Sequence, residues 1–208
     1  MRPCRGPVLE VDTPTDDERD WIFDTLQRPE IHRPLSLPRA PGRTEFDGSR
    51  LPLVDRHGPG VAYFEPLVFR RRADGSPWGL ALHYGWESWH DTTRELDIAV
   101  PGEEPGPVSL YVEATVLEAQ FVFRNGPNRR LRWRVPHVGG APPGWYRRLG
   151  ARSLGSFEEE HPATGEPIRK EVYEITRAEF ESRLARVGVG LGEDLADAGV
   201  TAWQVLHG

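Results

Sequence analysis

Residues 95–157 constrain the fold more than any other stretch, because their pattern is strand, breaker, helix, strand. Residues 95–100 (ELDIAV) alternate polar and apolar side chains, and residues 131–135 (LRWRV) do the same. Between them, residues 101–107 (PGEEPGP) cannot hold a regular element, and the mostly apolar residues 109–123 are long enough for a buried helix. A unit of this length predicts two parallel strands joined by a crossover helix. Ligands of such units bind where the first strand gives way to the helix.

The composition indicates a soluble protein with one substantial core. The chain has 208 residues and a net charge of −6, which argues against nucleic acid as an obligate partner. Cys4 is the only cysteine, so no disulfide can form within one chain and a reducing compartment is expected. The chain shows neither a signal peptide nor an apolar run that spans a membrane, which predicts a cytoplasmic location.

The remaining pattern extends the central unit to the order β-α-β-β-β-α-β-α-β-β-α. It predicts an α/β (α+β) fold with a mixed sheet of six to seven strands flanked by helices. Thr15 with Glu18, and Thr176 with Glu179, have the spacing of capping boxes and predict two helix starts. We expect one domain over residues 1–187 and a C-terminal extension over 188–208, which could dock on a neighbouring molecule.

The order of these elements, with several local strings, resembles the GNAT superfamily of N-acyltransferases over residues 8–184. The closest similarity is to the subgroup that acetylates protein N-termini and small amines. Residues 146–151 (YRRLGA) stand where that subgroup has a Tyr-x-x-Leu-Gly-Phe string, and 177–180 (RAEF) match its last helix start. The resemblance implies an acyl thioester donor, acetyl-CoA or another acyl-CoA, and an amine acceptor. No metal is expected, because no His-x-His or His-x-x-x-His pair occurs.

The loop before the central helix departs from the family pattern. The family holds the CoA pyrophosphate with a Gln/Arg-x-x-Gly-x-Gly/Ala loop, whose backbone N–H groups face the phosphates. Here Pro107 and Ser109 stand where the two glycines belong, and Pro107 has no N–H. Glu103 and Glu104 add negative charge beside the expected phosphates. We therefore expect weak binding of free acetyl-CoA, and a donor on an acyl-carrier protein is an alternative.

The resemblance assigns roles to three side chains. Tyr146 matches the tyrosine that protonates the leaving thiolate, although a packing tyrosine on a short helix would give the same string. Glu95 and Asp97 lie on the central strand, where the family often deprotonates its amine through a carboxylate. The alternative for both carboxylates is a solvated or salt-bridged strand face, with Arg94 or Arg132 as the partner.

The resemblance also implies that backbone groups contact the donor. The expected donor contacts are Ile98, Ala99 and Val100 on the strand and Val108, Ser109 and Leu110 at the helix start.

Other polar side chains carry weaker hypotheses. His83, Glu87 and His90 fall on or after one strand, and a histidine base is possible there, although surface histidines are the simpler interpretation. The histidines lack the spacing of a metal site. Residues 158–161 (EEEH) read as a solvated loop. Several tryptophans could line an acyl or acceptor pocket, but core packing is the default for aromatic residues on strands.

Two functions remain open at this point. The first is acyl transfer from an acyl-CoA or an acyl-carrier protein to a small-molecule or peptide amine, without nucleic acid or membrane as a partner. The second is a binding or interaction module that keeps the fold but has lost the CoA site, because a fold does not fix a function. The sequence leaves the acceptor, the acyl length and the oligomeric state, including a homodimer, open.

Overall fold

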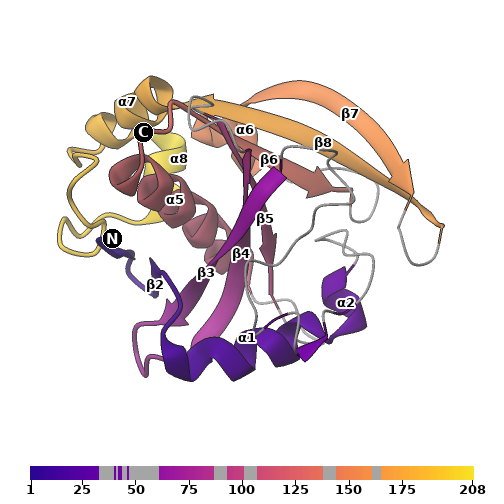
Figure 1. The fold of residues 1–208 in the computed structure, drawn as a ribbon. Helices are drawn as coiled ribbons and strands as arrows, with labels where there is room; N and C mark the ends of the chain where they lie inside the picture. Colours follow the sequence, from indigo (N-terminus) through magenta and orange to yellow (C-terminus); the bar gives the residue numbers. More distant parts are fainter. Residues whose placement is uncertain are drawn as a thin grey trace.

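The structure is a computed structural model that describes residues 1–32, 40, 42–43, 46, 61–86, 93–100, 107–137, 144–160 and 165–208. At residues 30, 32, 61–65, 83–86, 93–97 and 99 it describes the backbone alone. One twisted sheet runs through the molecule, with helices packed on it (Figure 1).

The described strands form an eight-stranded sheet in the order β1-β2-β3-β4-β5-β6-β8-β7. Only β5 and β6 are parallel neighbours in it, so the predicted mixed sheet is confirmed. The short β1 adds one strand to the predicted number. The strands are β1 (Cys4–Arg5), β2 (Leu9–Asp12), β3 (Val61–Arg71), β4 (Pro77–Trp86), β5 (Thr93–Ala99), β6 (Arg130–Pro136), β7 (Arg152–Glu160) and β8 (Pro167–Thr176).

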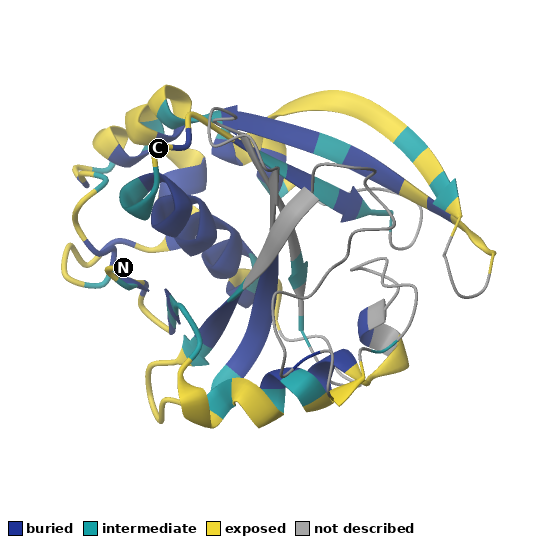
Figure 2. Cartoon of the chain, in the orientation of Figure 1, coloured by how far each residue is buried: buried dark blue, intermediate teal, exposed yellow. Residues whose placement is uncertain are grey.

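The central unit has the predicted form. Strand β5 leads into α5 (Val108–Asn125), and α5 leads into β6, which pairs parallel to β5. Helix α5 is buried along almost its whole length (Figure 2). The other described helical elements are η1 (Asp16–Glu18), α1 (Arg19–Leu26), α2 (Pro29–His32), α6 (Trp145–Leu149), α7 (Arg177–Arg186) and α8 (Ala202–His207).

Strands β3 and β4 divide their side chains between two cores. Leu67, Phe69 and Ala81 belong to the larger core, which also contains α5. Val68 and Leu80 belong to a smaller core with α1 and α2. This division follows the two-residue period of a strand, and it places α5 and α1 on opposite faces of the sheet (Figure 1). Within the described part of the chain, no helix combines the length and the apolar character needed to cross a membrane.

Both predicted capping boxes are present. Thr15 and Glu18 form the first box, but the first turn is a 3-10 turn, and α1 begins only at Arg19. Thr176 and Glu179 form the second box at the start of α7. In each case the local sequence was sufficient, because a capping box requires only contacts between residues three apart.

The β7–β8 hairpin is longer than the sequence indicates. Glu158, Glu159 and Glu160, predicted to begin a loop, lie on β7 and pair with the start of β8. The carboxylate of Glu159 lies 3.0 Å from the ammonium of Lys170, which is almost fully buried. This ion pair explains how an acidic run can continue the strand. The outer strand β7 is mostly exposed, whereas β8 is mostly buried (Figure 2).

The C-terminal segment packs on its own chain. Its apolar side chains enter the core that contains α5, and α8 contacts α5, α6 and α7. The carboxylate of Asp194 lies 2.7 Å from the guanidinium of Arg124, and both side chains are 6% exposed. Arg124 also donates to the carbonyl oxygens of Leu191, Glu193 and Pro3. These bonds hold the segment against the end of α5. The buried apolar residues are Val189, Leu195, Val200, Ala202, Val205 and Leu206.

Glu113 of α5 holds the N-terminal strands. Its Oε1 atom accepts from the backbone N–H groups of Val8 at 2.8 Å and Leu9 at 2.7 Å. We expect Glu113→Ala to lower the unfolding free energy by about 3 kcal/mol, because two amides lose their acceptor. Glu113→Gln keeps an acceptor oxygen, so we expect a loss of about 1 kcal/mol or less. Urea unfolding measures both values.

The pH dependence gives a second test of Glu113. Burial raises the pKa of this carboxyl group, although the two amides and Arg72 oppose that shift. A folded-state pKa above the unfolded one means that stability is lost as the pH rises through the folded value. Glu113→Gln is expected to remove this part of the pH dependence. Equal losses from the alanine and glutamine variants would contradict the account.

Candidate active site

The sheet opens between β5 and β6. These strands pair at Thr93 with Arg130 and continue to Leu96 with Trp133, where their described pairing ends. Strand β5 nevertheless continues to Ala99, still paired with β4, and β6 continues to Pro136, still paired with β8. Beyond Leu96 and Trp133, β5 therefore stays paired with β4, and β6 with β8, but β5 and β6 no longer pair with each other. The facing backbone edges of the two strand ends form no ladder with each other in the described chain, and their peptide groups can bond a ligand.

Helix α5 begins next to this opening. Pro107 is its N-cap residue and has no N–H to donate. Val108 and Ser109 are exposed, and the first N–H groups of a helix have no acceptor within it. The amide of Leu110, by contrast, donates to the carbonyl oxygen of Pro107 at 2.8 Å, and its side chain is buried. The helix start therefore offers the amides of Val108 and Ser109 to an anion. Glu103 and Glu104 lie outside the described residues.

Tyr146 lies in an aromatic cluster on the same side of the sheet as α5. Its ring is stacked on that of Tyr173, with centroids 5.0 Å apart and planes at 11°. Its centroid is 5.3 Å from that of Trp133 and 5.7 Å from that of Trp145. Trp133 is the β6 residue at which pairing with β5 ends, so the cluster lies at the base of the opening. Tyr146 is 6% exposed, and the surrounding rings fix its position.

A buried carboxylate of α5 accepts a hydrogen bond from Trp133 of this cluster. The indole N–H of Trp133 donates to Oε2 of Glu118 at 3.0 Å, and Glu118 lies in the middle of α5 with no exposed surface. Burying a polar group costs free energy unless it is hydrogen-bonded, so this bond fixes the plane of the indole. The cluster is therefore held by α5, β6, α6 and β8 together.

The structure locates the other candidates to different degrees. Glu95 and Asp97 lie on β5, where Glu95 pairs with Arg132 of β6 and Asp97 with Leu82 of β4. Only their backbone is described, and the same holds for His83 on β4. Glu87 and His90 lie outside the described residues. Ile98 and Val100 are half-buried and pack against the main core, and Ala99 ends β5.

Arg132 was one predicted salt-bridge partner of Glu95 or Asp97 on β5, but Glu174 of β8 competes for it. Arg132 donates to Glu174 of β8 at 2.8 Å, and Arg152 of β7 bonds the same carboxylate. Burial by itself would raise the pKa of Glu174, but hydrogen bonds from Arg152 and Arg132 outweigh it and lower the pKa. The Nε–H group of Arg132 is therefore already donated to Glu174 within the described chain.

Sequence reasoning missed Tyr173 as a site residue. Its ring is 1% exposed, and the guanidinium of Arg147 lies 6.0 Å from its centroid. Burial raises the pKa of Tyr173, so its hydroxyl stays protonated at neutral pH. A strand tyrosine of this kind carries no local signal, because its partner Tyr146 is on a separate helix. Alternation along β8 does predict that it shares a face with Glu171 and Ile175.

Solved acetyltransferase structures share the fold of this chain. Spermidine N-acetyltransferase from Vibrio cholerae, in complex with CoA and spermine, has a TM-score of 0.63 at 13% identity, over 83% of this chain and 97% of that chain. A GCN5-related N-acetyltransferase (GNAT) from Brucella melitensis matches 99% of this chain and 94% of its own, at 17% identity and a TM-score of 0.57. The protein has the GNAT fold.

A further structure that matches is an aminoglycoside acetyltransferase in complex with coenzyme A. It has a TM-score of 0.53 at 16% identity, over 84% of this chain and 98% of that chain. No protein-family model and no curated protein sequence matches the chain. At such identities the likeness establishes the fold, and the reaction must be argued from the site.

Proposed function

We propose that this protein transfers an acyl group from a thioester to an amine. The observation that carries the proposal is the opening of the sheet after Leu96 and Trp133, with the start of α5 and the Tyr146 cluster beside it. A thioester in this opening has its carbonyl oxygen near the backbone N–H groups of residues 98–100, which stabilise the charge that develops during attack.

Each step of the proposed reaction has a group in this chain. The amine nitrogen attacks the carbonyl carbon, a C–N bond forms and the C–S bond breaks. Glu95, Asp97 or a water takes the proton from the amine, and Tyr146 gives a proton to the leaving thiolate. The donor is an acyl-CoA or an acyl-carrier protein, and the acceptor is a small-molecule or peptide amine. Support for this acceptor class comes from the Vibrio cholerae structure, which contains spermine.

The test is release of free thiol from a panel of acyl-CoA and carrier-bound thioesters with a panel of primary amines. The proposal predicts thiol release that depends on both the protein and the amine. Absence of release from every donor, with folded protein, would favour the second candidate, a module that binds without catalysis. Pro107 supports that candidate, because a proline at the helix start has no backbone N–H group to donate to a phosphate.

We further expect free acetyl-CoA to bind weakly. Each lost charge-assisted hydrogen bond costs about 1.5–3 kcal/mol, which is about tenfold to a hundredfold in the dissociation constant. Replacing Glu103 and Glu104 by Gln, and Pro107 and Ser109 by Gly, should strengthen binding. Calorimetric titration measures the dissociation constant of acetyl-CoA for the wild type and for this variant. A low-micromolar dissociation constant for the wild type, or a crystal with CoA on the amides of residues 108–111, would overturn this expectation.

A further inference from the structure

His137 lies just past the end of β6 that borders the opening between β5 and β6. It follows Pro136, the last residue of β6, and its backbone N–H donates to the carbonyl oxygen of Arg169 at 2.9 Å, so bonding to β8 continues to this position. The described pairing with β5 ends four residues earlier, at Trp133. The two-residue period of a strand puts His137 on the same face as Trp133, which is the face of the Tyr146 cluster.

The two ring nitrogens of His137 lie in different surroundings. Nε2 is buried and lies 3.7 Å from Oε2 of Glu171 on β8, slightly beyond hydrogen-bond distance. Nδ1 is not one of the buried unbonded atoms of the described chain, and no described residue bonds to it, so it is the accessible nitrogen of the ring. A proton on Nε2, facing the carboxylate, leaves the lone pair of Nδ1 available to accept another.

Glu171 is held in place as a carboxylate. Its Oε1 accepts from the hydroxyl of Ser153 on β7, and the guanidinium of Arg147 on α6 lies 3.4 Å from the same atom. The hydrogen bond from Ser153 lowers the pKa of Glu171; burial opposes this shift, and the charges of Arg147 and His137 add to it. Glu171 therefore turns Oε2 toward the imidazole and fixes its orientation, as the carboxylate does in known carboxylate–histidine pairs.

The same network reaches the tyrosine cluster. The guanidinium of Arg147 lies 6.0 Å from the ring centroid of Tyr173, and Tyr173 shares a face of β8 with Glu171 two residues away. Tyr146 stacks on Tyr173. The indole N–H of Trp145, which packs on Tyr146, is buried and has no hydrogen bond to a described residue. One face of the sheet thus carries a phenol and a carboxylate-oriented imidazole beside the opening.

We propose that His137, oriented by Glu171, is the base that takes the proton from the attacking amine. The inference rests on the acyl-transfer proposal and gives it a base other than the β5 carboxylates. As the amine nitrogen bonds to the carbonyl carbon, its proton passes to Nδ1, and the electron pair of the C–S bond leaves with the sulfur. The thiolate takes a proton from Tyr146. The imidazolium then gives its proton to water, and the phenolate recovers one from water.

The first test is the pH dependence of kcat/KM for the amine, measured by thiol release. The described charged groups around the ring are Glu171, Arg147 and Arg169. His137→Gln should lower kcat/KM by about a hundredfold or more and remove the loss of activity at low pH that protonation of the imidazole causes. Glu171→Gln should move that loss to lower pH, because the imidazolium loses its carboxylate. The titration of the amine itself is common to all variants.

Two controls separate a base from a packing residue. His207→Gln, at an exposed histidine of α8, is the matched control and should keep the wild-type profile. His137→Ala removes the ring, and imidazole added to the buffer should restore part of its activity, with a rate that follows the neutral form of imidazole. A packing role would give no such rescue. Thermal unfolding checks that each variant is folded.

Nitrogen-15 NMR of the imidazole tests the pair without any substrate. The neutral ring should carry its proton on Nε2, and Glu171→Gln should lower the midpoint of the ring titration. An unchanged midpoint would refute the pairing with Glu171. A folded His137→Gln variant with the wild-type pH profile would overturn the base assignment and leave acyl transfer intact. Wild-type protein that releases no thiol from any donor would overturn the proposed function, and this assignment with it.

Discussion

A chain that ends at Val187 is expected to lose the folded state. Deleting residues 188–208 removes five large aliphatic side chains that are 7% exposed or less and that fill the core around α5. Burial of each contributes about 1.5–3 kcal/mol, so together they account for about 10 kcal/mol. A typical domain has a total stability of about 5–15 kcal/mol. The lost burial free energy is therefore comparable to the total stability of a typical domain.

The deletion also leaves a buried charge alone. Arg124 would lose the carboxylate of Asp194 and two carbonyl acceptors while it remains at the end of α5. Circular dichroism and thermal unfolding measure the outcome, and we expect no cooperative transition. The matched control is Trp203→Ala at an exposed position of α8, which should unfold cooperatively. A truncated chain that melts near the wild-type temperature would show that the segment is a dispensable extension.

Tyr146→Phe is expected to reduce turnover by about a hundredfold or more, if the phenol is the general acid. The variant keeps the ring that stacks on Tyr173 and packs on Trp133, so the unfolding free energy should change by about 1 kcal/mol or less. Turnover with a saturating donor and amine, and urea unfolding, give the two values.

Tyr173→Phe separates the two stacked phenols. If Tyr146 is the acid, this variant should keep most of the activity, because its ring supports the same stack. Unchanged turnover in a folded Tyr146→Phe variant would remove Tyr146 from the mechanism. A large loss in Tyr173→Phe alone would transfer the role to a residue that the sequence did not single out.

Local patterns were sufficient to predict the centre of the fold. The breaker at residues 101–107 and the apolar run after it predict a crossover helix, and a crossover requires the parallel pair that β5 and β6 form. A capping box of Thr201 and Gln204 starts α8, and this box can also be recognised in the sequence alone. The spacing of Thr and Gln there is the signal that would have extended the prediction to this helix.

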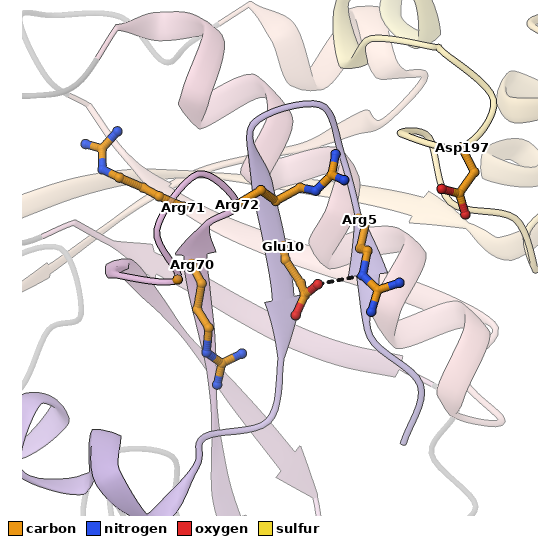
Figure 3. A pocket seen from close by; sticks show the side chains of 7 residues that line it. Arg5, Glu10, Arg70, Arg71, Arg72 and Asp197 are labelled. Carbon is orange, nitrogen blue, oxygen red and sulfur yellow. Dashed lines mark hydrogen bonds and ion pairs between the residues drawn. The ribbon is translucent and has the colours of Figure 1, made fainter.

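The packing of distant segments was not accessible in the same way. The Arg124–Asp194 pair joins residues that are 70 positions apart, and the Tyr146–Tyr173 stack joins a short helix to a strand. Neither contact leaves a periodic trace in the sequence, because each depends on the completed sheet. A third case is a cavity that combines two N-terminal strands, β3 with its following turn, and the C-terminal segment (Figure 3); its lining is Arg5, Glu10, Arg70, Arg71, Arg72, Gly75 and Asp197.

The most direct test of the central claim measures both products of one reaction. The protein is incubated with the best thioester donor and its amine, and free thiol and acylated amine are quantified over time. The account predicts equal amounts of the two products in the wild type and a parallel fall of both in Tyr146→Phe. Thiol release without acylated amine, or no release with any donor, would contradict acyl transfer by this chain.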